Sequence, residues 1–494
     1  MLIQSSYNDI QKRKIKWKAL IVACLLMTII ILLPPQPGLP ISGQMALGIL
    51  AFAVVIWTTE AMSYPLGGIF ILIFITVLLS FGPSLNNPET FMGTKEALNL
   101  ALSGFSNPAV AMVVGALFLV SAMKTTKLDR RVALWILSKV GSNIHSILLG
   151  TILVGIVLSL LIPSPTARVG AMIPIILGMA SAFDLPKNTK VSAMLLITSA
   201  QISTIWGVGI KTGAAQNIIG LTLVEESFSY SITWGQWFLA AAPWSILMTI
   251  VLYFIALIGL KHELVRIPKG KKVIENELKE LGPLNGSQIR LLLIMIGLLF
   301  LWSTEKTFHT LDSTTIIMIG LAFLFFPLIG VLSWDHVEKD ISWGPIILFA
   351  SGISLGTVLL KTFAAAWLAD SLFTSLHLDT MSEEFVIAIL IAFMIVLHLG
   401  FASATSLVAT LIPVVIALVE EMTLPNGMGV VLITQFAMSF GFILPINAPQ
   451  NLLAYGTGTF RQLDFIKNGL ALTFFGYIFL MFLSMTYWKW IGLL

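Results

Sequence analysis

Charged residues are scarce in this chain: Asp, Glu, Lys and Arg make up 11% of its 494 residues, whereas soluble domains carry about 25%. This scarcity excludes an ordinary soluble domain. Cysteine is almost absent, with Cys24 as its one representative, so a disulfide framework is excluded as well. Because 57% of the residues are hydrophobic, we expect a polytopic helical membrane protein embedded in a lipid bilayer.

The chain also lacks the residue patterns of an intramembrane enzyme. No His-Glu-x-x-His zinc motif occurs, and the six His stand singly; we interpret His398 as a helix-packing residue. Ser164 has no nearby base in sequence other than Lys211, which leaves a Ser-Lys hydrolase as a remote alternative. We therefore predict no enzyme. The pI near 9.0 reflects basic loops and indicates no nucleic-acid partner.

Two stretches half the chain apart carry nearly the same pattern. Ser164-Pro165-Thr166 leads to Ile173-Pro174, and Ser403-Ala404-Thr405 leads to Ile412-Pro413; we call these the first and second tips. Other pairs recur in the same order at nearly one spacing: Trp57-Thr58-Thr59-Glu60 with Trp302-Ser303-Thr304-Glu305, Lys124-Thr125 with Lys361-Thr362, and Gln216-Asn217 with Gln450-Asn451. Such a repeat in an apolar chain is typical of a secondary transporter whose site lies at the repeat interface.

The apolar runs predict an all-α polytopic membrane protein built from two inverted repeats. We expect about 11 transmembrane helices plus two re-entrant hairpins, with the fifth and tenth spans discontinuous. The expected parts are an N-terminal basic segment with the first transmembrane helix at 1–40, a first repeat at 41–260, a cytoplasmic linker at 261–287 and a second repeat at 288–494. The basic N-terminus resembles a signal peptide, but a retained first helix fits better.

Most of the 28 Lys and Arg fall in the loops of one side if the N-terminus is cytoplasmic, as the positive-inside rule requires.

Four polar interruptions at membrane depth predict the binding site. They are the two tips and two segments that break helical runs, Gly207 to Asn217 (the first break) and Pro445 to Asn451 (the second break). Hydroxyls, amides and free backbone N–H groups at helix N-termini suit a carboxylate. The candidate substrate residues here are Ser164, Thr166, Asn217, Ser403, Thr405 and Asn451. The alternative is that the two Thr are N-caps and the two Asn are turn residues.

Arg168 and Lys211 are cations at membrane depth, and they have no counterpart in the second repeat, where Leu407 and Pro445 stand. Buried charges usually face a cavity or a partner. Both are predicted to bind the substrate by balancing two carboxylates. The alternative is that each pairs with a buried acid such as Glu60.

The chain resembles the divalent anion:sodium symporter family over almost its whole length. The markers are Trp57-Thr58-Thr59-Glu60-Ala61 before Pro65, Ser106-Asn107-Pro108, Lys124-Thr125, the tip Ser164-Pro165-Thr166-Ala167-Arg168, Gly213-Ala214-Ala215-Gln216-Asn217, Ser342-Trp343-Gly344 and Pro449-Gln450-Asn451. The resemblance implies a homodimer, in which each protomer has a scaffold and a transport domain that moves like an elevator. It also implies that the tip Ser and Thr residues touch the substrate carboxylates.

The chain departs from that family where sodium would bind. The family's tip Asn is replaced by Pro165 and Ala404, and Leu160 and Leu399 stand where the family often has hydroxyls. Sodium remains a possible partner, near Ser164, Gly209, Ser403 and Ala448, through backbone oxygens. Lys211 is expected to place a fixed positive charge where a sodium ion would otherwise bind.

The sequence therefore predicts a bacterial inner-membrane carrier of small di- or tricarboxylates such as succinate, malate, oxoglutarate or citrate. An elevator-type mechanism is expected, with exchange slightly favoured. The alternatives are sodium-coupled symport and, more remotely, an anion channel, which needs a continuous pore rather than two half-sites.

Overall fold

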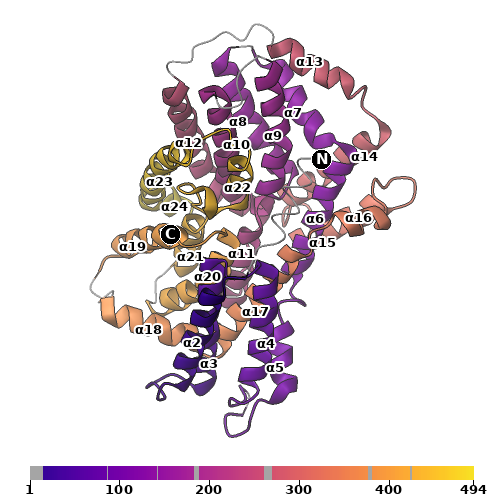
Figure 1. The fold of residues 1–494 in the computed structure, drawn as a ribbon. Coiled ribbons are helices and arrows are strands. Elements are labelled where there is room, and N and C mark those ends of the chain that lie inside the picture. The colour runs from indigo at the N-terminus through magenta and orange to yellow at the C-terminus, as the bar shows by residue number, and fades with distance from the viewer. Residues whose placement is uncertain are drawn as a thin grey trace.

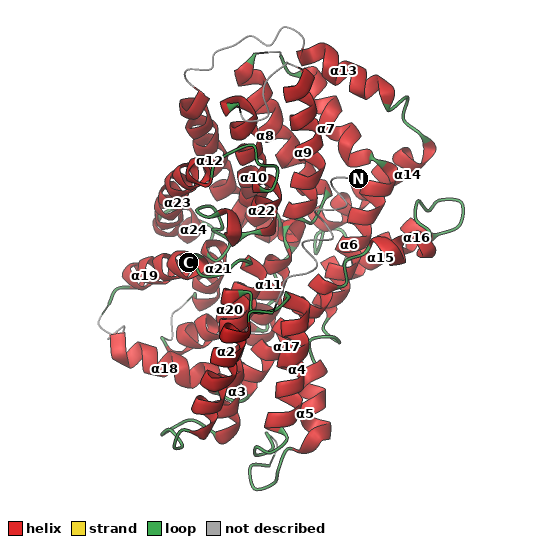
Figure 2. Ribbon diagram, viewed as in Figure 1, coloured by secondary structure: helices red, strands yellow, loops and turns green. Residues whose placement is uncertain are grey.

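The computed structural model describes residues 15–85, 87–141, 143–182, 189–260, 270–376, 381–422 and 426–494. These residues form helices joined by turns and contain no β-sheet (Figure 2). Lys12 of the expected basic N-terminal segment, the basic loop residue Lys187 and residues 261–269 of the expected linker lie outside the described ranges. The remainder of the linker contains the short helix α13 (Gly270–Glu280).

The described residues of the first half form a series of helices. They are α2 (Trp17–Leu32), α3 (Ile41–Thr59), α4 (Tyr64–Leu79), α5 (Gly93–Leu102), α6 (Pro108–Thr126), α7 (Leu128–Lys139), α8 (Ile144–Leu161), α9 (Pro165–Ala182), α10 (Lys190–Gly209), α11 (Ala215–Phe228) and α12 (Trp234–Leu260). Local signals fix several of the starts. Asn107 caps α6 ahead of Pro108, and Asn143 caps α8, because both side chains accept a free N–H of the first turn.

The second half repeats this order. Its helices are α14 (Gly286–Ser303), α15 (Ser313–Phe325), α16 (Trp334–Asp340), α17 (Gly344–Lys361), α18 (Ala364–Leu376), α19 (Glu383–His398), α20 (Ala404–Glu421), α21 (Gly427–Ala437), α22 (Pro449–Tyr455), α23 (Gln462–Met485) and α24 (Tyr487–Trp490). Helix α15 ends at Phe325 because Phe326 precedes Pro327 and takes an extended conformation.

Nine helices in the described part of the chain are long and apolar enough to cross a membrane, and shorter apolar helices such as α2, α4 and α15 accompany them. The large apolar exposure of α12, where Ile250, Phe254 and Ile258 are each about half exposed or more, fits a surface that faces lipid. The predicted count of eleven spans with two re-entrant hairpins stays a prediction.

Both tips and both breaks occur where the sequence predicted them. Helix α8 ends at Leu161 and α9 begins at Pro165, while α19 ends at His398 and α20 begins at Ala404. The first break is a single 3-10 turn, Lys211–Gly213, between α10 and α11. The second is longer than expected, because α21 already ends at Ala437 and the chain reaches its 3-10 turn only at Pro445–Asn447. In between, the Phe442 carbonyl accepts a bond from Gln201 Nε2 instead of a helical N–H.

The helices gather so that the tips and breaks come to the middle of the molecule. In Figure 1, α2 to α5 lie at one end and α7, α8, α9 and α13 at the other, with α11 and α20 between them. Helix α11 packs against α20, α17 and α21, and α22 packs against α9 and α10. Segments of the first repeat thus lie directly against segments of the second.

Candidate functional site

The two tips and the two breaks line one central cavity of about 160 Å³. The tips contribute Pro163 to Thr166 and Ser403 to Thr405, and the breaks contribute Ala215, Gln216 and Ile218 together with Ala448 to Gln450. The rest of the lining is apolar and comes mainly from α6: Val113, Ala116, Leu117 and Val120, with Pro345 of α17. Residues that are half the chain apart thus form a single pocket.

Four helices begin at this cavity. Their first residues, Pro165 of α9, Ala215 of α11, Ala404 of α20 and Pro449 of α22, all line it. The first N–H groups of a helix have no partner within it, and its N-terminus carries a partial positive charge of about +0.5; α22 is short and contributes less. No Asp, Glu, Lys or Arg is among the residues that line the cavity in the described part of the chain. The cavity is therefore electropositive without a charged side chain, as suits an anion.

The tip hydroxyls divide into caps and free cavity residues. Ser403 is the N-cap of α20, and its Oγ accepts the Ser406 N–H; Ser164 Oγ accepts the Ala167 N–H in the same way. Thr166 and Thr405 lie inside the first turns and line the cavity, half-buried. The N-cap alternative for the two Thr is therefore wrong, because the Ser residues perform the capping.

At the breaks, Gln rather than Asn lines the cavity. Gln216 and Gln450 are among its walls. Asn217 is turned away and donates from Nδ2 to the carbonyls of Gly207 (2.6 Å) and Ile210 (3.0 Å), and Asn451 donates to the carbonyl of Gly441 (2.6 Å). The structure thus does not bring the two Asn into the cavity: their side chains tie each new helix to the segment before its break. The sequence could have indicated Gln216 and Gln450, because each directly precedes one of the predicted Asn residues and neighbouring helical residues point in different directions.

Arg168 lies behind the first tip with 0% of its surface exposed. Its Nη1 donates to the carbonyls of Ile162 (2.9 Å) and Gly213 (3.1 Å), and its Nη2 donates to that of Ser203 (2.8 Å). The guanidinium therefore links the first tip to both sides of the first break. It does not line the cavity, so direct contact with the substrate is not part of this arrangement.

Neutral side chains occupy the matching place in the second repeat. Asn447 Nδ2 donates to the carbonyls of His398 (2.7 Å) and Phe401 (3.0 Å), and His398 Nε2 lies 3.3 Å from the Asn447 carbonyl. Phe401 precedes Ser403 as Ile162 precedes Ser164, and Asn447 precedes Asn451 as Gly213 precedes Asn217. Corresponding carbonyls are thus engaged by side-chain nitrogen atoms in both halves.

These contacts bear on sodium, which was expected near Ser164, Gly209, Ser403 and Ala448. Ser164, Ser403 and Ala448 line the cavity, whereas Gly209 is buried against Ser245. A sodium ion needs several oxygen ligands, but the carbonyls of Ile162, Ser203 and Gly213 already accept bonds from a cation. Arg168 therefore places a fixed cation on oxygen atoms beside the first tip, and a sodium ion near the four expected residues stays a prediction.

Lys211 lines a second cavity of about 280 Å³, together with Asp312 and Ser313 at the start of α15. It is 6% exposed, and its Nζ donates to the Ile232 carbonyl (2.6 Å) and to Ser313 Oγ (3.3 Å). Ser313 Oγ donates in turn to Glu305 (2.9 Å), which also accepts the Trp234 N–H. Lys211 is therefore linked to a buried acid, as the alternative expected, but that acid is Glu305, the counterpart of Glu60 in the second repeat.

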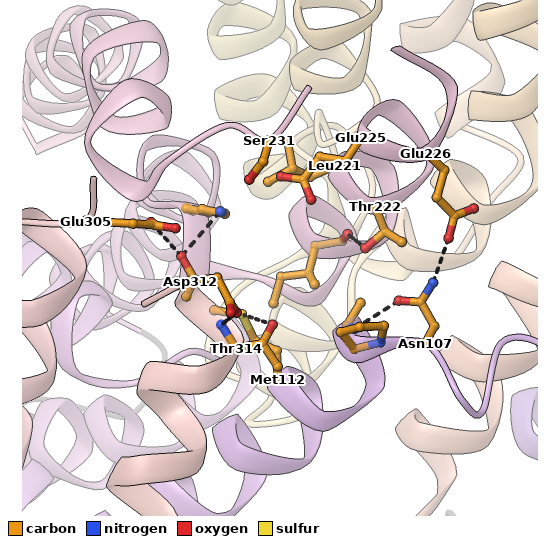
Figure 3. Close-up of a pocket in the computed structure, with 15 residues that line it drawn as sticks. Asn107, Met112, Leu221, Thr222, Glu225, Glu226, Ser231, Glu305, Asp312 and Thr314 are labelled. Atoms are coloured by element: carbon orange, nitrogen blue, oxygen red, sulfur yellow. Dashed lines mark hydrogen bonds between the residues drawn. The ribbon is translucent and has the colours of Figure 1, made fainter. Parts of the chain in front are cut away.

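The rest of this second cavity is rich in carboxylates. Glu225, Glu226 and Asp312 line it, and Asn107 Nδ2 donates to Glu226 (2.8 Å) at its edge (Figure 3). Among the described residues, no group of three or more His, Cys, Asp or Glu is arranged to hold a metal ion. This negative lining makes the second cavity a poor site for a dianion.

The protein is similar to bacterial membrane carriers. A membrane protein of Cupriavidus necator is 44% identical over 97% of this chain and 94% of its own. The L-tartrate/succinate antiporter of Escherichia coli K12 is 26% identical over 97% of this chain and 99% of its own. The sodium-dependent dicarboxylate transporter SdcS of Staphylococcus saprophyticus is 26% identical over 89% of this chain and 85% of its own.

The fold is also found among transporters. The crystal structure of the YdaH transporter of Alcanivorax borkumensis matches with a TM-score of 0.54 at 14% identity, covering 88% of this chain and 99% of that one. The model of the sodium:sulfate symporter transmembrane region matches residues 14–494. The chain is thus an integral membrane protein and belongs to the sodium:sulfate symporter family, the divalent anion:sodium symporters that its motifs predicted.

Proposed function

We propose that the protein is a secondary transporter of small di- or tricarboxylates, of the succinate, malate, oxoglutarate and citrate type. The central cavity carries this proposal: two hydroxyl tips, two Gln side chains and four helix N-termini surround it. A carboxylate accepts several hydrogen bonds at once, and donors on two opposed half-sites suit a molecule with a carboxylate at each end. The similarity to the L-tartrate/succinate antiporter and to the dicarboxylate transporter SdcS supports the same substrate class.

The carrier works by exchange. Arg168 places a permanent positive charge behind the first tip, where its guanidinium engages the carbonyls of Ile162, Ser203 and Gly213. A bound dianion balances this charge together with the helix N-termini. Without the anion, the charge is uncompensated as the site crosses the membrane, and an unpaired buried charge is costly. The empty carrier therefore crosses rarely, and one anion leaves only when another enters.

Movement follows the elevator scheme that the family resemblance implies. The tips and breaks lie against an apolar wall of α6, a surface along which they slide without breaking hydrogen bonds. We propose that the protein is a homodimer in the bacterial inner membrane with a cytoplasmic N-terminus. Native mass spectrometry that found only monomers in mild detergent would contradict the dimer.

Uptake of labelled succinate into proteoliposomes tests the proposal. We expect saturable uptake that needs internal dicarboxylate and proceeds at the same rate with sodium or with potassium. Thr166→Ala and Thr405→Ala should each weaken substrate binding by about 1.5–3 kcal/mol, the typical value of a hydrogen bond to a charged group. Steep sodium dependence and accumulation without internal anion would establish symport instead, and conductance without saturation would indicate a channel.

A further inference from the structure

A third cavity, of about 630 Å³, lies between α10, α12 and α23, away from the substrate site. Its walls are mostly apolar: Ala193, Met194 and Ile197 from α10, with Ile255, Ile258 and Gly259 from α12. Ile258 is 73% exposed, so the cavity opens on a face that is itself apolar. In a membrane such a face contacts lipid acyl chains.

The rim of this groove is basic. Lys190 at the start of α10, Arg461 just before α23 and Lys467 in its second turn all line it and are exposed. Asp464 is the one acid among the lining residues described; it pairs with Arg461 at 3.4 Å, and an exposed pair of this kind is weak. The rim therefore keeps an excess of positive charge.

Helix direction adds to this charge. Both α10 and α23 begin at the rim, at Lys190 and Gln462, and helix N-termini attract anions. Lys190 and Lys467 lie on the side of the membrane that the positive-inside rule assigns to the cytoplasm. This leaflet assignment rests on the orientation stated under the proposed function.

We propose that the groove between α10, α12 and α23 binds an anionic phospholipid of the cytoplasmic leaflet. Its phosphate lies among Lys190, Arg461 and Lys467, and an acyl chain lies along Ile197, Ile255 and Ile258. An apolar groove that opens toward acyl chains and has a cationic rim matches an amphiphile with an anionic head, since basic pockets between helices near a membrane surface bind such headgroups. A neutral lipid leaves the rim charges uncompensated, and a soluble anion leaves the apolar walls uncovered.

Native mass spectrometry of the delipidated full-length protein, titrated with phosphatidylglycerol or phosphatidylcholine, tests this site. Wild-type protein should bind phosphatidylglycerol at least about tenfold more tightly than phosphatidylcholine. The triple variant Lys190→Gln, Arg461→Gln, Lys467→Gln should lose this preference. Lys339→Gln, which removes an exposed cation of the same expected membrane side but outside the groove, should keep it.

A second variant separates the groove from the rim. Ala193→Phe fills the apolar wall and leaves the three cations in place, and it should also weaken phosphatidylglycerol binding, with glycerol phosphate as the soluble headgroup control. Unchanged lipid binding in the triple variant at an unchanged melting temperature would overturn the proposal. So would glycerol phosphate binding as tightly as the whole lipid, because the apolar walls would then play no part.

Discussion

At the scale of single residues, the two Gln-Asn pairs show how adjacent amides take different tasks. Gln216 faces the cavity, while Asn217 donates to Gly207 and Ile210 inside the protein. We expect Gln216→Ala to weaken dicarboxylate binding several-fold with little change in melting temperature. Asn217→Ala should lower the melting temperature, because the Gly207 carbonyl loses its bond and an unpaired buried group costs about 1–3 kcal/mol.

Isothermal titration and thermal denaturation of both variants check this division. Gln450→Ala and Asn451→Ala are the corresponding variants in the second half, where Gln450 Nε2 also donates to Thr204 Oγ1 (3.0 Å). If Asn217→Ala abolished substrate binding at an unchanged melting temperature, Asn217 would be a substrate ligand, as the sequence predicted.

Arg168 supports the second residue-scale prediction. Arg168→Gln removes the permanent charge, so sodium-independent exchange should be lost, whereas Arg168→Lys keeps the charge and should keep part of the activity. The freed carbonyls of Ile162, Ser203 and Gly213 should also let sodium raise the melting temperature of Arg168→Gln but not of wild type. Exchange at the wild-type rate in Arg168→Gln would show that the charge has no role in coupling.

The sequence predicted which segments line the central cavity but misjudged which of their side chains turn into it. Tip hydroxyls and the breaks were correctly placed at one cavity, because polar residues within apolar runs are conspicuous. Whether the Gln or the Asn of each pair faces the cavity depends on the residue at which the helix begins. Helix α11 begins at Ala215 and α22 at Pro449, and a shift of either start by one residue would turn different side chains toward the cavity. Lys211 could not be placed because its partner Glu305 comes from the other repeat.

At the scale of elements, the bonds of Lys211 tie the first break to the loop between α14 and α15. Lys211 and Glu305 share the Ser313 hydroxyl. Lys211→Met and Glu305→Gln should each lower the melting temperature, since each leaves the other charge buried alone. The double variant should lose less than the two single variants together, with an interaction energy of roughly 0.5–3 kcal/mol. Strict additivity would show that the two residues are not coupled.

The elements that the sequence missed are those without a long apolar run. Helix α13 carries many charges, and α5 and α18 are short, so a search for spans of about 20 apolar residues passes over them. The longer second break was also missed. Its cause is a contact from the other repeat, Gln201 Nε2 to the Phe442 carbonyl, and no local pattern announces that contact.

At the scale of the whole molecule, the elevator scheme requires the tips to move along α6. The single native cysteine, Cys24, can be replaced by Ser to give a clean background. Cysteines placed at Val113 of α6 and Gln450 of α22, which both line the cavity, should then be joined by a short bifunctional thiol reagent. Cross-linking should stop exchange, and reductive cleavage of the linker should restore it. Full exchange in completely cross-linked protein would mean that this wall does not move relative to the tips.

The neutral lining of the central cavity has a consequence for how transport responds to acidity. No ionisable side chain is among the residues described as lining it, and Arg168 behind the first tip stays protonated. The pH dependence of the exchange rate should then be set by the pKa values of the substrate. The rate should fall as the medium becomes acidic enough to protonate the second carboxylate of the transported molecule. The more acidic tartrate should retain its rate to a lower pH than succinate, as parallel exchange assays would show. Profiles that coincide for both acids would mean that a proton on the carrier governs its turnover.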